Sequence, residues 1–531
     1  MRRLLITAFA LNVLLGAPLW GRFGTLSPLI AWEAWVIAPA MLLLPAGRWR
    51  RWLGSGVVSA LALATATNLG DAATHTAFGR SLNLYLDVPL VRSIYHLLVG
   101  NVGQLAAICL MLLGGVLLIG VLWLMLRLLL PARPPTRRGR ARNAAVVLLV
   151  VSSSMALLEA NHYRLVPQAA LPMVATARFQ WEQVVDTHRA RQAFSAQLEE
   201  TPIAAQVLPG LAGRNVLLTF IESYGVSALK DPRYNRTLLL TMEDLKRRLS
   251  QRDLHVVSGL VASPIRGGQS WLAHATTLSG RWIDNQLWYR LMLESGHSTM
   301  IDDFRASGQR TLSVMPAITL AWPEGRAYGF DQIVAAKDMP YEGPPLNWVT
   351  MPDQFTLDYT QRELLGNSPL FAQIALISSH APWTPILPVL ENWSLVGDGS
   401  LYAPWENAGD PPEVIWRDLE RIRDHYAWSV DYAVSVAGRW AERVTNEQTL
   451  LIVLGDHQPA PLITGDEASA AVPVHIISGD PALLDPFKRR GFVEGMLPPL
   501  AHPQEAPRMS QLRHWLQQDF GPAATSARTT P

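Results

Sequence analysis

Cysteine is nearly absent from this chain, and charged residues are few. Cys109 is the only cysteine among 531 residues, which excludes an intrachain disulfide and any zinc finger or ribbon built from cysteines. Charged side chains make up 17% of the residues, against roughly 25% in a typical soluble protein, and apolar residues make up 49%. This composition excludes an intrinsically disordered chain and argues against a protein that is soluble over its whole length.

Lysine is missing altogether from the first 160 residues. This part has 14 arginines and four acidic residues, a net charge of +10. The remainder has 31 basic and 39 acidic residues, a net charge of −8. The contrast indicates two parts with different surroundings, and at roughly 150 residues per domain the length allows several domains.

Five apolar segments in the first part approach the ~20 helical residues that cross a bilayer. The clearest runs from Leu105 to Leu130, and the weakest is 54–70, which is rich in Ala and Thr, so that four spans are the alternative. The first segment follows Arg2 and Arg3 and is interpreted as a retained signal anchor rather than a cleaved signal peptide. We therefore predict a transmembrane domain of about five helices over 1–160, at 4–20, 27–46, 54–70, 102–130 and 144–160.

Arginine is concentrated at three places around these segments: at residues 2–3, at 48–51 and at 133–142. If five helices cross the bilayer, all three lie on the same side, and the positive-inside rule makes that side cytoplasmic. We therefore expect a multi-pass protein of the cytoplasmic (inner) membrane with its C-terminal part outside, in the periplasm. A nucleic-acid partner for the basic loop at 133–142 is not expected, because the loop lies between two spans.

The pattern changes beyond residue 160. A helix-compatible connector is predicted over 161–210, broken by Pro202 and Pro209, and a flexible tail over 521–531. Between them, over 211–520, short apolar runs alternate with amphipathic segments, which indicates an α/β domain with a mostly parallel sheet between helices. Strands are predicted at 215–221, 254–261, 311–315, 373–379, 449–455 and 472–478, and helices at 238–250, 270–280, 298–307, 353–365, 415–446 and 506–518.

Metal-compatible side chains follow three of these predicted strands. Glu222 follows the run NVLLTFI, and His380 follows QIALISS. Asp456 and His457 follow TLLIVLG. The carboxyl ends of parallel strands share one edge of a sheet, where such folds place their sites. Carboxylates together with imidazoles suit Zn²⁺ or Mn²⁺.

A candidate nucleophile lies in the segment RGGQSWLAH, where Ser270 follows two glycines and begins a predicted helix. Glycines allow close approach of the backbone, and a helix N-terminus favours an anion. A serine hydroxyl coordinated to a divalent cation can ionise near neutral pH and attack phosphorus or sulfur. The simpler interpretation is that Ser270 is a helix N-cap.

Together these motifs resemble the alkaline-phosphatase/sulfatase superfamily, and most of all its membrane-anchored branch of lipoteichoic acid synthases and phosphoglycerol transferases. The resemblance implies about five spans followed by an extracytoplasmic sulfatase-like α/β domain. It is carried by FIESYG at 220–225, RGGQSW at 266–271, YGFD at 328–331, MPDQFTL at 351–357, SSHAPW at 378–383 and LGDHQP at 454–459.

By position in these motifs, the resemblance implies that Glu222, Asp456 and His457 ligate one divalent metal, Mn²⁺ or Zn²⁺, with Mg²⁺ as a further option. It implies that Ser270 is both a fourth ligand and the nucleophile. His380 would hold a phosphate oxygen or assist the leaving group.

Arg266 and Trp383 are candidate substrate contacts. The implied reaction moves a phosphoglycerol-like group from a phospholipid donor to a glycan or lipid acceptor through Ser270. The first alternative is hydrolysis of a phosphodiester or sulfate ester at the same residues. The second alternative is a non-enzymatic membrane sensor or scaffold that keeps the fold.

Two departures from relatives narrow the chemistry. Formylglycine sulfatases have Cys or Ser in a C/S-x-P-x-R context. Ser270 is followed by Trp271, Leu272, Ala273 and His274 and so lacks that Pro and Arg. A sulfatase that depends on formylglycine is therefore not expected. A phosphoethanolamine donor is also less expected, because transferases of that type have disulfide-stapled outer domains.

Several further polar residues are predicted to be structural. A loop arginine in solvent is the simpler interpretation of Arg266. His255, His274 and His475 are expected to be structural histidines, and Asp331 and Asp353 turn or helix-cap residues.

Overall fold

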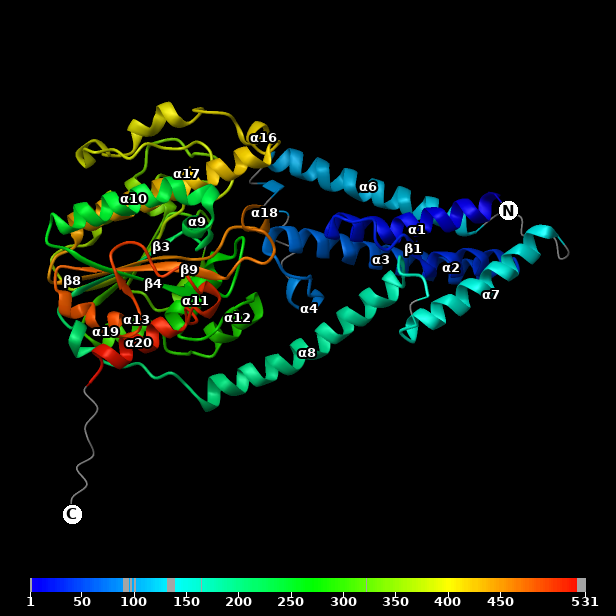
Figure 1. Ribbon diagram of the computed structural model, residues 1–531, viewed down its shortest axis with the longest axis horizontal. Helices are drawn as coiled ribbons and strands as arrows, with labels where there is room; N and C mark the ends of the chain where they lie inside the picture. Colours follow the sequence, from blue (N-terminus) through cyan, green and yellow to red (C-terminus); the bar gives the residue numbers. More distant parts are fainter. Residues whose placement is uncertain are drawn as a thin grey trace, which may run out of the picture. The chain divides into compact units, whose positions relative to one another are not determined.

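The computed structural model describes residues 2–88, 95, 98–99, 102–130, 139–163, 165–320 and 322–522. The predicted tail from residue 523 onward and most of the basic loop at 133–142 lie outside these residues. The chain divides into two compact units, Met1–Gln192 and Ala193–Pro531, which are described separately (Figure 1).

The N-terminal unit is helical. Four of its described helices are long and apolar enough to cross a membrane by length and composition: Arg2–Phe23, Arg48–Phe78, Gln104–Leu129 and Arg142–Ala160. The helices are α1 (Arg2–Phe23), α2 (Trp32–Leu43), α3 (Arg48–Phe78), α4 (Leu84–Asp87), α6 (Gln104–Leu129), α7 (Arg140–Ala160) and α8 (Pro172–Glu200), and Ile30–Ala31 (β1) pairs in parallel with Ala169–Ala170 (β2).

The second predicted span, 27–46, does not match a helix long enough to cross the membrane. It contains α2, which has 12 residues. At 1.5 Å per residue such a helix extends about 18 Å, well short of the ~30 Å hydrocarbon core. The weakest predicted span, 54–70, instead lies inside the 31-residue helix α3. The orientation deduced from arginine placement counts five crossings and stays a prediction.

The C-terminal unit is an α/β domain. Its strands are β3 (Asn215–Ile221), β4 (His255–Ala262), β5 (Arg310–Met315), β6 (Gln332–Ala335), β7 (Leu370–Ala375), β8 (Thr449–Gly455), β9 (Ala471–Ser478) and β10 (Val493–Glu494). Its main helices are α9 (Ser227–Lys230), α10 (Pro232–Ser250), α11 (Ser270–Ser279), α12 (Gln286–Glu294), α13 (Met300–Ala306), α15 (Asp353–Tyr359), α17 (Leu419–Val444), α18 (Pro461–Thr464) and α20 (Gln511–Phe520).

The sheet has the order β10-β4-β9-β8-β3-β7-β5-β6. Strands β8, β3, β7, β5 and β6 are parallel to one another, and β9 is antiparallel to both β8 and β4. The sheet is therefore mixed, with a parallel block at its centre. The reversal at β9 has a local cause, because β8 and β9 are joined by a loop without a crossover helix long enough to return the chain.

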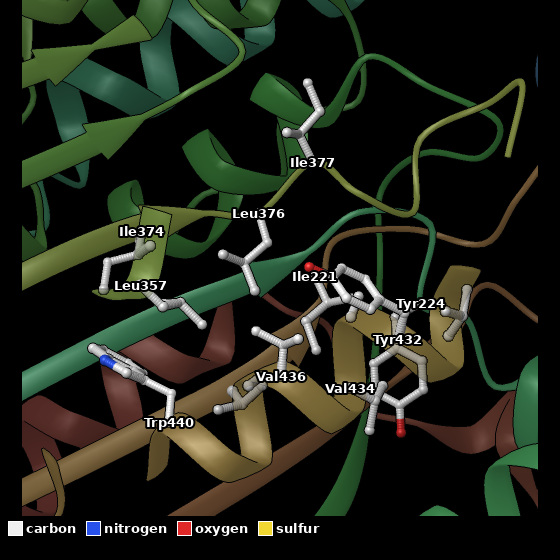
Figure 2. Packing of buried hydrophobic residues seen from close by; sticks show 14 of the residues in the cluster. Ile221, Tyr224, Leu357, Ile374, Leu376, Ile377, Tyr432, Val434, Val436 and Trp440 are labelled. Carbon is white, nitrogen blue, oxygen red and sulfur yellow. The ribbon is translucent and has the colours of Figure 1, made fainter. Parts of the chain in front are cut away.

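Helices cover both faces of this sheet (Figure 1). In β3, Leu217 and Ile221 face one cluster of buried residues, to which α10 and α17 contribute, whereas Val216 and Phe220 face a second cluster, to which α11, α13 and α20 contribute. Figure 2 shows part of the first cluster, including Ile221 among side chains of α17. The central strand is mostly apolar because neither of its faces meets water.

Candidate metal and nucleophile site

The carboxyl ends of β3 and β8 place three candidate ligands side by side. The two strands pair in parallel up to Ile221 and Gly455, so the next residues on each, Glu222 and Asp456, leave the sheet together. The backbone N–H of Asp456 still donates to the carbonyl of Ile221, at 3.2 Å. Parallel pairing thus brings together residues more than 230 positions apart in the sequence.

Close backbone contact at this edge requires glycine at position 455. A Cβ atom on Gly455 would lie 1.9 Å from the carbonyl oxygen of Tyr224, closer than two such atoms can approach. The turn after β3 is itself unusual, since Ser223 has a φ of 57°. A non-glycine residue in this left-handed region costs roughly 1–3 kcal/mol and persists only where the surroundings hold it.

Ser270 is brought to the same edge by the loop after β4. This loop is anchored to the β8 extension, because the Gly267 N–H donates to the Gln458 carbonyl at 2.9 Å. Gln269, in the left-handed region with a φ of 65°, turns the chain into α11, and Ser270 is the first helical residue. The N-cap position is therefore Gln269, and the hydroxyl of Ser270 is directed elsewhere.

The four groups form one cluster. The Ser270 hydroxyl donates to Glu222 Oε2 at 2.8 Å and lies 3.2 Å from His457 Nε2. His457 Nε2 is also 3.1 Å from Glu222 Oε1 and 3.8 Å from Asp456 Oδ1. One ligand atom from each of Glu222, Asp456 and His457 lies within 4.8 Å of the others. Asp456 and His457 are 1% exposed and Glu222 is 8% exposed, so water is largely excluded from them.

The tautomer of His457 follows from its hydrogen bonds. Its Nδ1 lies 2.8 Å from the carbonyl oxygen of Gln458, which can only accept, so Nδ1 carries the proton. In the neutral ring Nε2 therefore has a lone pair, and that lone pair is aimed at the cluster. Metal-binding histidines are commonly oriented in this way by a backbone carbonyl.

The carboxylates and the imidazole shift one another's pKa values. Burial favours the neutral forms of Glu222 and Asp456, but the His457 side chain outweighs burial for Glu222 and holds its pKa well below the ordinary range. For Asp456, burial and the neighbouring Glu222 charge raise the pKa well above its ordinary range. Burial would lower the pKa of His457, yet Asp456 and Glu222 raise it to about 9.

This donor set fits a divalent cation. Two buried carboxyl groups lie on either side of a single imidazole. Two negative charges repel each other strongly in a low-dielectric site, and a cation between them offsets that repulsion. Asp456 Oδ1 already accepts N–H groups from Ser223 at 2.8 Å and from His457 at 2.6 Å, which fixes the carboxylate plane. Oxygen and nitrogen donors without sulfur suit Mn²⁺, Zn²⁺ or Mg²⁺.

His380 lies on the loop after β7, which is the strand on the other side of β3. The preceding residue, Ser379, donates to the Glu222 carbonyl at 2.6 Å, so this loop lies beside the cluster. The Nδ1 of His380 lies 2.5 Å from the Ala381 carbonyl, so Nε2 is the nitrogen left for a substrate. The role predicted for His380 stays a prediction.

Arg266 and Trp383, the predicted substrate contacts, have partners within the protein. The Arg266 guanidinium donates to the carbonyls of Asp466, at 2.9 Å, and of Ala468. Trp383 is 5% exposed, donates from its indole N–H to the Ser379 carbonyl at 2.8 Å and stacks on Trp416. Both side chains thus hold loops at the site's edge in place.

Of the other residues predicted to be structural, His274 and Asp331 have partners within the domain, whereas His255 does not lie in the core. Burial lowers the pKa of His274 to about 4, and its ring packs on Phe220 with centroids 4.1 Å apart. His255 is exposed at the start of β4. Asp331, predicted to be a turn residue, instead accepts the N–H of Thr311, 20 residues earlier in the chain, at 2.7 Å.

Asp353 differs from its predicted role as a turn or cap residue. Its Oδ1 accepts the backbone N–H groups of Ile377, at 2.7 Å, and Ser378, at 2.9 Å. It therefore braces the loop that carries His380. A cap assignment from sequence looks only to the residue's own helix, whereas these partners lie 24 and 25 residues further along the chain.

Three supporting residues were not identified from the sequence. Ser379 donates to the Glu222 carbonyl at 2.6 Å, Ser263 donates to the Asp456 carbonyl at 2.6 Å, and Tyr426 donates to the Ser223 carbonyl at 3.1 Å. The only sequence signal for the first is its position in SSHAPW, directly before His380. Nothing in the local sequence marks the other two, because their partners lie in distant strands.

Comparison with known proteins gives matches among solved structures only. No protein-family model and no curated protein matches the chain. The chain is similar to the lipoteichoic acid synthase LtaP from Listeria monocytogenes, with 12% identity and a TM-score of 0.35 over 51% of this chain and 66% of that one, just under two thirds.

Two further matches have comparable scores. The phosphoglycerol transferase GacH from Streptococcus pyogenes is 13% identical, with a TM-score of 0.35 over 55% of this chain and 74% of that one. The C-terminal periplasmic domain of EptC from Escherichia coli is 13% identical, with a TM-score of 0.36 over 60% of this chain and 86% of that one.

Proposed function

We propose that this protein is a membrane-bound, metal-dependent phosphotransferase that moves a phosphoglycerol-like headgroup from a phospholipid to a glycan or lipid hydroxyl outside the cytoplasm. The observation that carries the proposal is the position of the Ser270 hydroxyl, 2.8 Å from Glu222 and 3.2 Å from His457 within a buried set of metal ligands. A merely structural serine has no reason to lie in such a cluster. The choice of a phospholipid donor comes from the resemblance of the sequence motifs to those of phosphoglycerol transferases.

Glu222, Asp456, His457 and Ser270 are the residues that would hold the cation. When bound, a divalent cation supplies positive charge that lowers the pKa of a coordinated hydroxyl and stabilises charge on phosphorus-bound oxygens. Ser270 directs its proton at Glu222 Oε2, so a lone pair of its Oγ is available to attack. The backbone bonds to Asp456 and His457 keep both side chains in place during the reaction.

In the first half-reaction, Ser270 Oγ passes its proton along its hydrogen bond to Glu222 Oε2 and forms a bond to the phosphorus, while the bond from phosphorus to the diacylglycerol oxygen breaks. That oxygen leaves with a proton, for which a protonated His380 is the candidate donor. In the second half-reaction the acceptor hydroxyl attacks the same phosphorus and gives its proton to the now neutral His380. The bond between Ser270 Oγ and the phosphorus breaks, and Ser270 regains its proton from Glu222. Both halves use one site, as covalent catalysis of this type requires.

The test is turnover of phosphatidylglycerol, labelled in its headgroup, by the detergent-purified full chain with added Mn²⁺. Release of diacylglycerol is expected, together with a phosphoglycerol adduct on Ser270 that mass spectrometry detects. In Ser270→Ala, release is expected to fall at least a thousandfold. Ser227→Ala is the matched control, because this serine lies in α9 and its hydroxyl is not among the cluster contacts.

Diacylglycerol release that persists in Ser270→Ala would remove the nucleophile assignment. The products made with and without a glycan acceptor separate transfer from hydrolysis: free glycerol phosphate in both cases supports the hydrolase. A wild-type protein that binds Mn²⁺ but turns over none of these lipids would favour the sensor or scaffold alternative.

A further inference from the structure

A buried chain of hydrogen bonds runs from the turn after β3 through the sheet to its far strand. Tyr224, His475 and Ser258 are each 0–1% exposed. The Tyr224 hydroxyl lies 3.1 Å from His475 Nε2, His475 Nδ1 lies 2.7 Å from Ser258 Oγ, and the Ser258 hydroxyl lies 2.6 Å from the Gly495 carbonyl. These polar side chains lie in a sheet whose other inward residues are mostly apolar.

The protons in this chain can be assigned. The Gly495 carbonyl can only accept, so the single hydroxyl proton of Ser258 goes to it. Ser258 Oγ must then accept from His475, which places the ring proton on Nδ1. Because burial lowers the pKa of His475 to about 3, the ring is neutral, and Nε2 accepts the hydroxyl proton of Tyr224. Every donor and acceptor in the chain is used in one arrangement only.

One end of this series of hydrogen bonds lies beside the candidate metal ligands. Tyr224 is two residues after Glu222, and its backbone carbonyl passes against Gly455, the residue before Asp456. Between Glu222 and Tyr224 lies Ser223, in the left-handed region. A residue in that conformation needs external support, and the structure provides it from two tyrosines: Tyr426 holds the Ser223 carbonyl, and the hydroxyl of Tyr224 is held by His475.

We propose that His475 is a positioning residue: by accepting the Tyr224 hydroxyl it keeps the 222–225 turn in the conformation that presents Glu222 to Ser270 and His457. An apolar pair at these positions would fill the same space but would remove the hydrogen bond that fixes the Tyr224 side chain at the end of the turn. The inference rests on the proposed metal site, because its purpose is to preorganise a ligand. Partners that orient metal ligands typically change metal affinity by 10–100-fold when removed.

The test compares two single substitutions that each delete one buried tyrosine hydroxyl. Tyr224→Phe removes the bond to His475. Tyr234→Phe is the matched control, because Tyr234 is equally buried and donates to the Ile463 carbonyl at 2.8 Å, away from the turn. Amide hydrogen exchange over 220–226 is measured in the metal-free full chain, and the Mn²⁺ dissociation constant is measured by titration.

In Tyr224→Phe, exchange over 220–226 is expected to rise at least tenfold and the Mn²⁺ dissociation constant to rise at least tenfold. Tyr234→Phe is expected to stay within twofold of wild type in both. Unchanged exchange in Tyr224→Phe, or an equal rise in Tyr234→Phe, would overturn the proposal.

The double variant Tyr224→Phe/His475→Leu separates positioning from stability. This variant removes both partners of the bond between Tyr224 and His475, so Nε2 is no longer buried without a donor, and Ser258 keeps its bond to the Gly495 carbonyl. Its unfolding midpoint is therefore expected to recover in part relative to Tyr224→Phe, while fast exchange and weak Mn²⁺ binding persist. If all three recover together, His475 is only structural and the proposal fails. If wild type does not bind Mn²⁺, the proposed function fails, and the exchange data from metal-free protein still decide whether His475 positions the turn.

Discussion

The buried carboxyl group of Asp353 destabilises the domain but holds a loop in a defined conformation. Asp353 is fully buried, and its Oδ1 is occupied by the N–H groups of Ile377 and Ser378. Its Oδ2 has no hydrogen-bond partner among the described residues. Burial raises its pKa to about 6, against the opposing effect of the two backbone N–H groups.

The sign of this shift gives a pH prediction. A carboxyl group whose pKa is higher in the folded state binds more protons there, so it destabilises the fold above about pH 6 and ceases to do so as the pH falls toward 4. In Asp353→Asn the amide oxygen keeps both backbone bonds and no charge is buried. We expect the variant to be more stable than wild type at pH 8, by up to about 3 kcal/mol, and the difference to vanish near pH 4.

Denaturant unfolding of both proteins between pH 4 and pH 8 measures this difference, and subtracting one curve from the other removes the contributions of groups they share. Asp353→Ala is the control, since it loses the two backbone bonds and is expected to be less stable than Asp353→Asn at every pH. A constant difference between wild type and Asp353→Asn across the range would contradict the assignment.

At the scale of elements, the site depends on how closely β8 can approach the turn after β3. The carbonyl of Tyr224 occupies the space where a side chain at position 455 would begin. The two elements are also linked by the Ser223 N–H bond to Asp456. The carboxyl ends of the two strands and the ligands they carry therefore form one unit.

Gly455→Ala is expected to separate these elements. With a Cβ 1.9 Å from a backbone oxygen, β8 or the turn must shift, and we expect a loss of stability of roughly 3 kcal/mol or more. Because the shift separates Glu222 from Asp456, Mn²⁺ binding is expected to be lost even under conditions where the variant remains folded. Thermal unfolding and Mn²⁺ titration measure the two effects.

Gly465→Ala is a suitable control for that experiment, because the position lies further along the same loop and has open space around its Cα. Gly465 has a φ of 77°, so alanine there is strained, but no atom of the site has to move. Its Mn²⁺ affinity is expected to match that of wild type. Equal binding by Gly455→Ala would show that the two elements do not need this close contact.

At the scale of the whole molecule, a cation at the cluster would add a further link between segments that hydrogen bonds already bring together at the edge of the sheet. Its ligands come from the ends of β3 and β8 and from the start of α11. A ligand that binds only the folded state stabilises it in proportion to the logarithm of its concentration. Unfolding of the C-terminal unit should therefore depend on metal.

We expect Mn²⁺ at 100 times its dissociation constant to stabilise the C-terminal unit by about 2.7 kcal/mol, and a chelator to reverse the effect. The shift is measured by thermal unfolding of the full chain in detergent, with and without Mn²⁺. In Asp456→Asn the shift is expected to be lost, because the amide cannot supply negative charge to the cation. A shift of the same size in Asp456→Asn would place the cation elsewhere.

Much of this architecture can be predicted from local patterns of apolar and polar residues. Apolar runs with defined ends predicted β3 and β8 at their observed bounds, because a strand buried on both faces is a nearly continuous apolar run that stands out from the polar residues around it. The same logic placed Glu222, Asp456 and His457 at strand ends and Ser270 at a helix start. The sequence also marked the long apolar helices, although α2 is shorter than the run that contains it.

Tertiary structure decided what depends on partners far away in the chain. The antiparallel course of β9, the brace from Asp353 to Ile377 and Ser378, and the bond from His475 to Tyr224 all join segments that local patterns treat as independent. A side chain's hydrogen-bond partner is set by strand register and packing, and neither is encoded within a few residues of it. The residues of the site could thus be proposed from sequence alone, whereas the interactions that orient them required the folded chain.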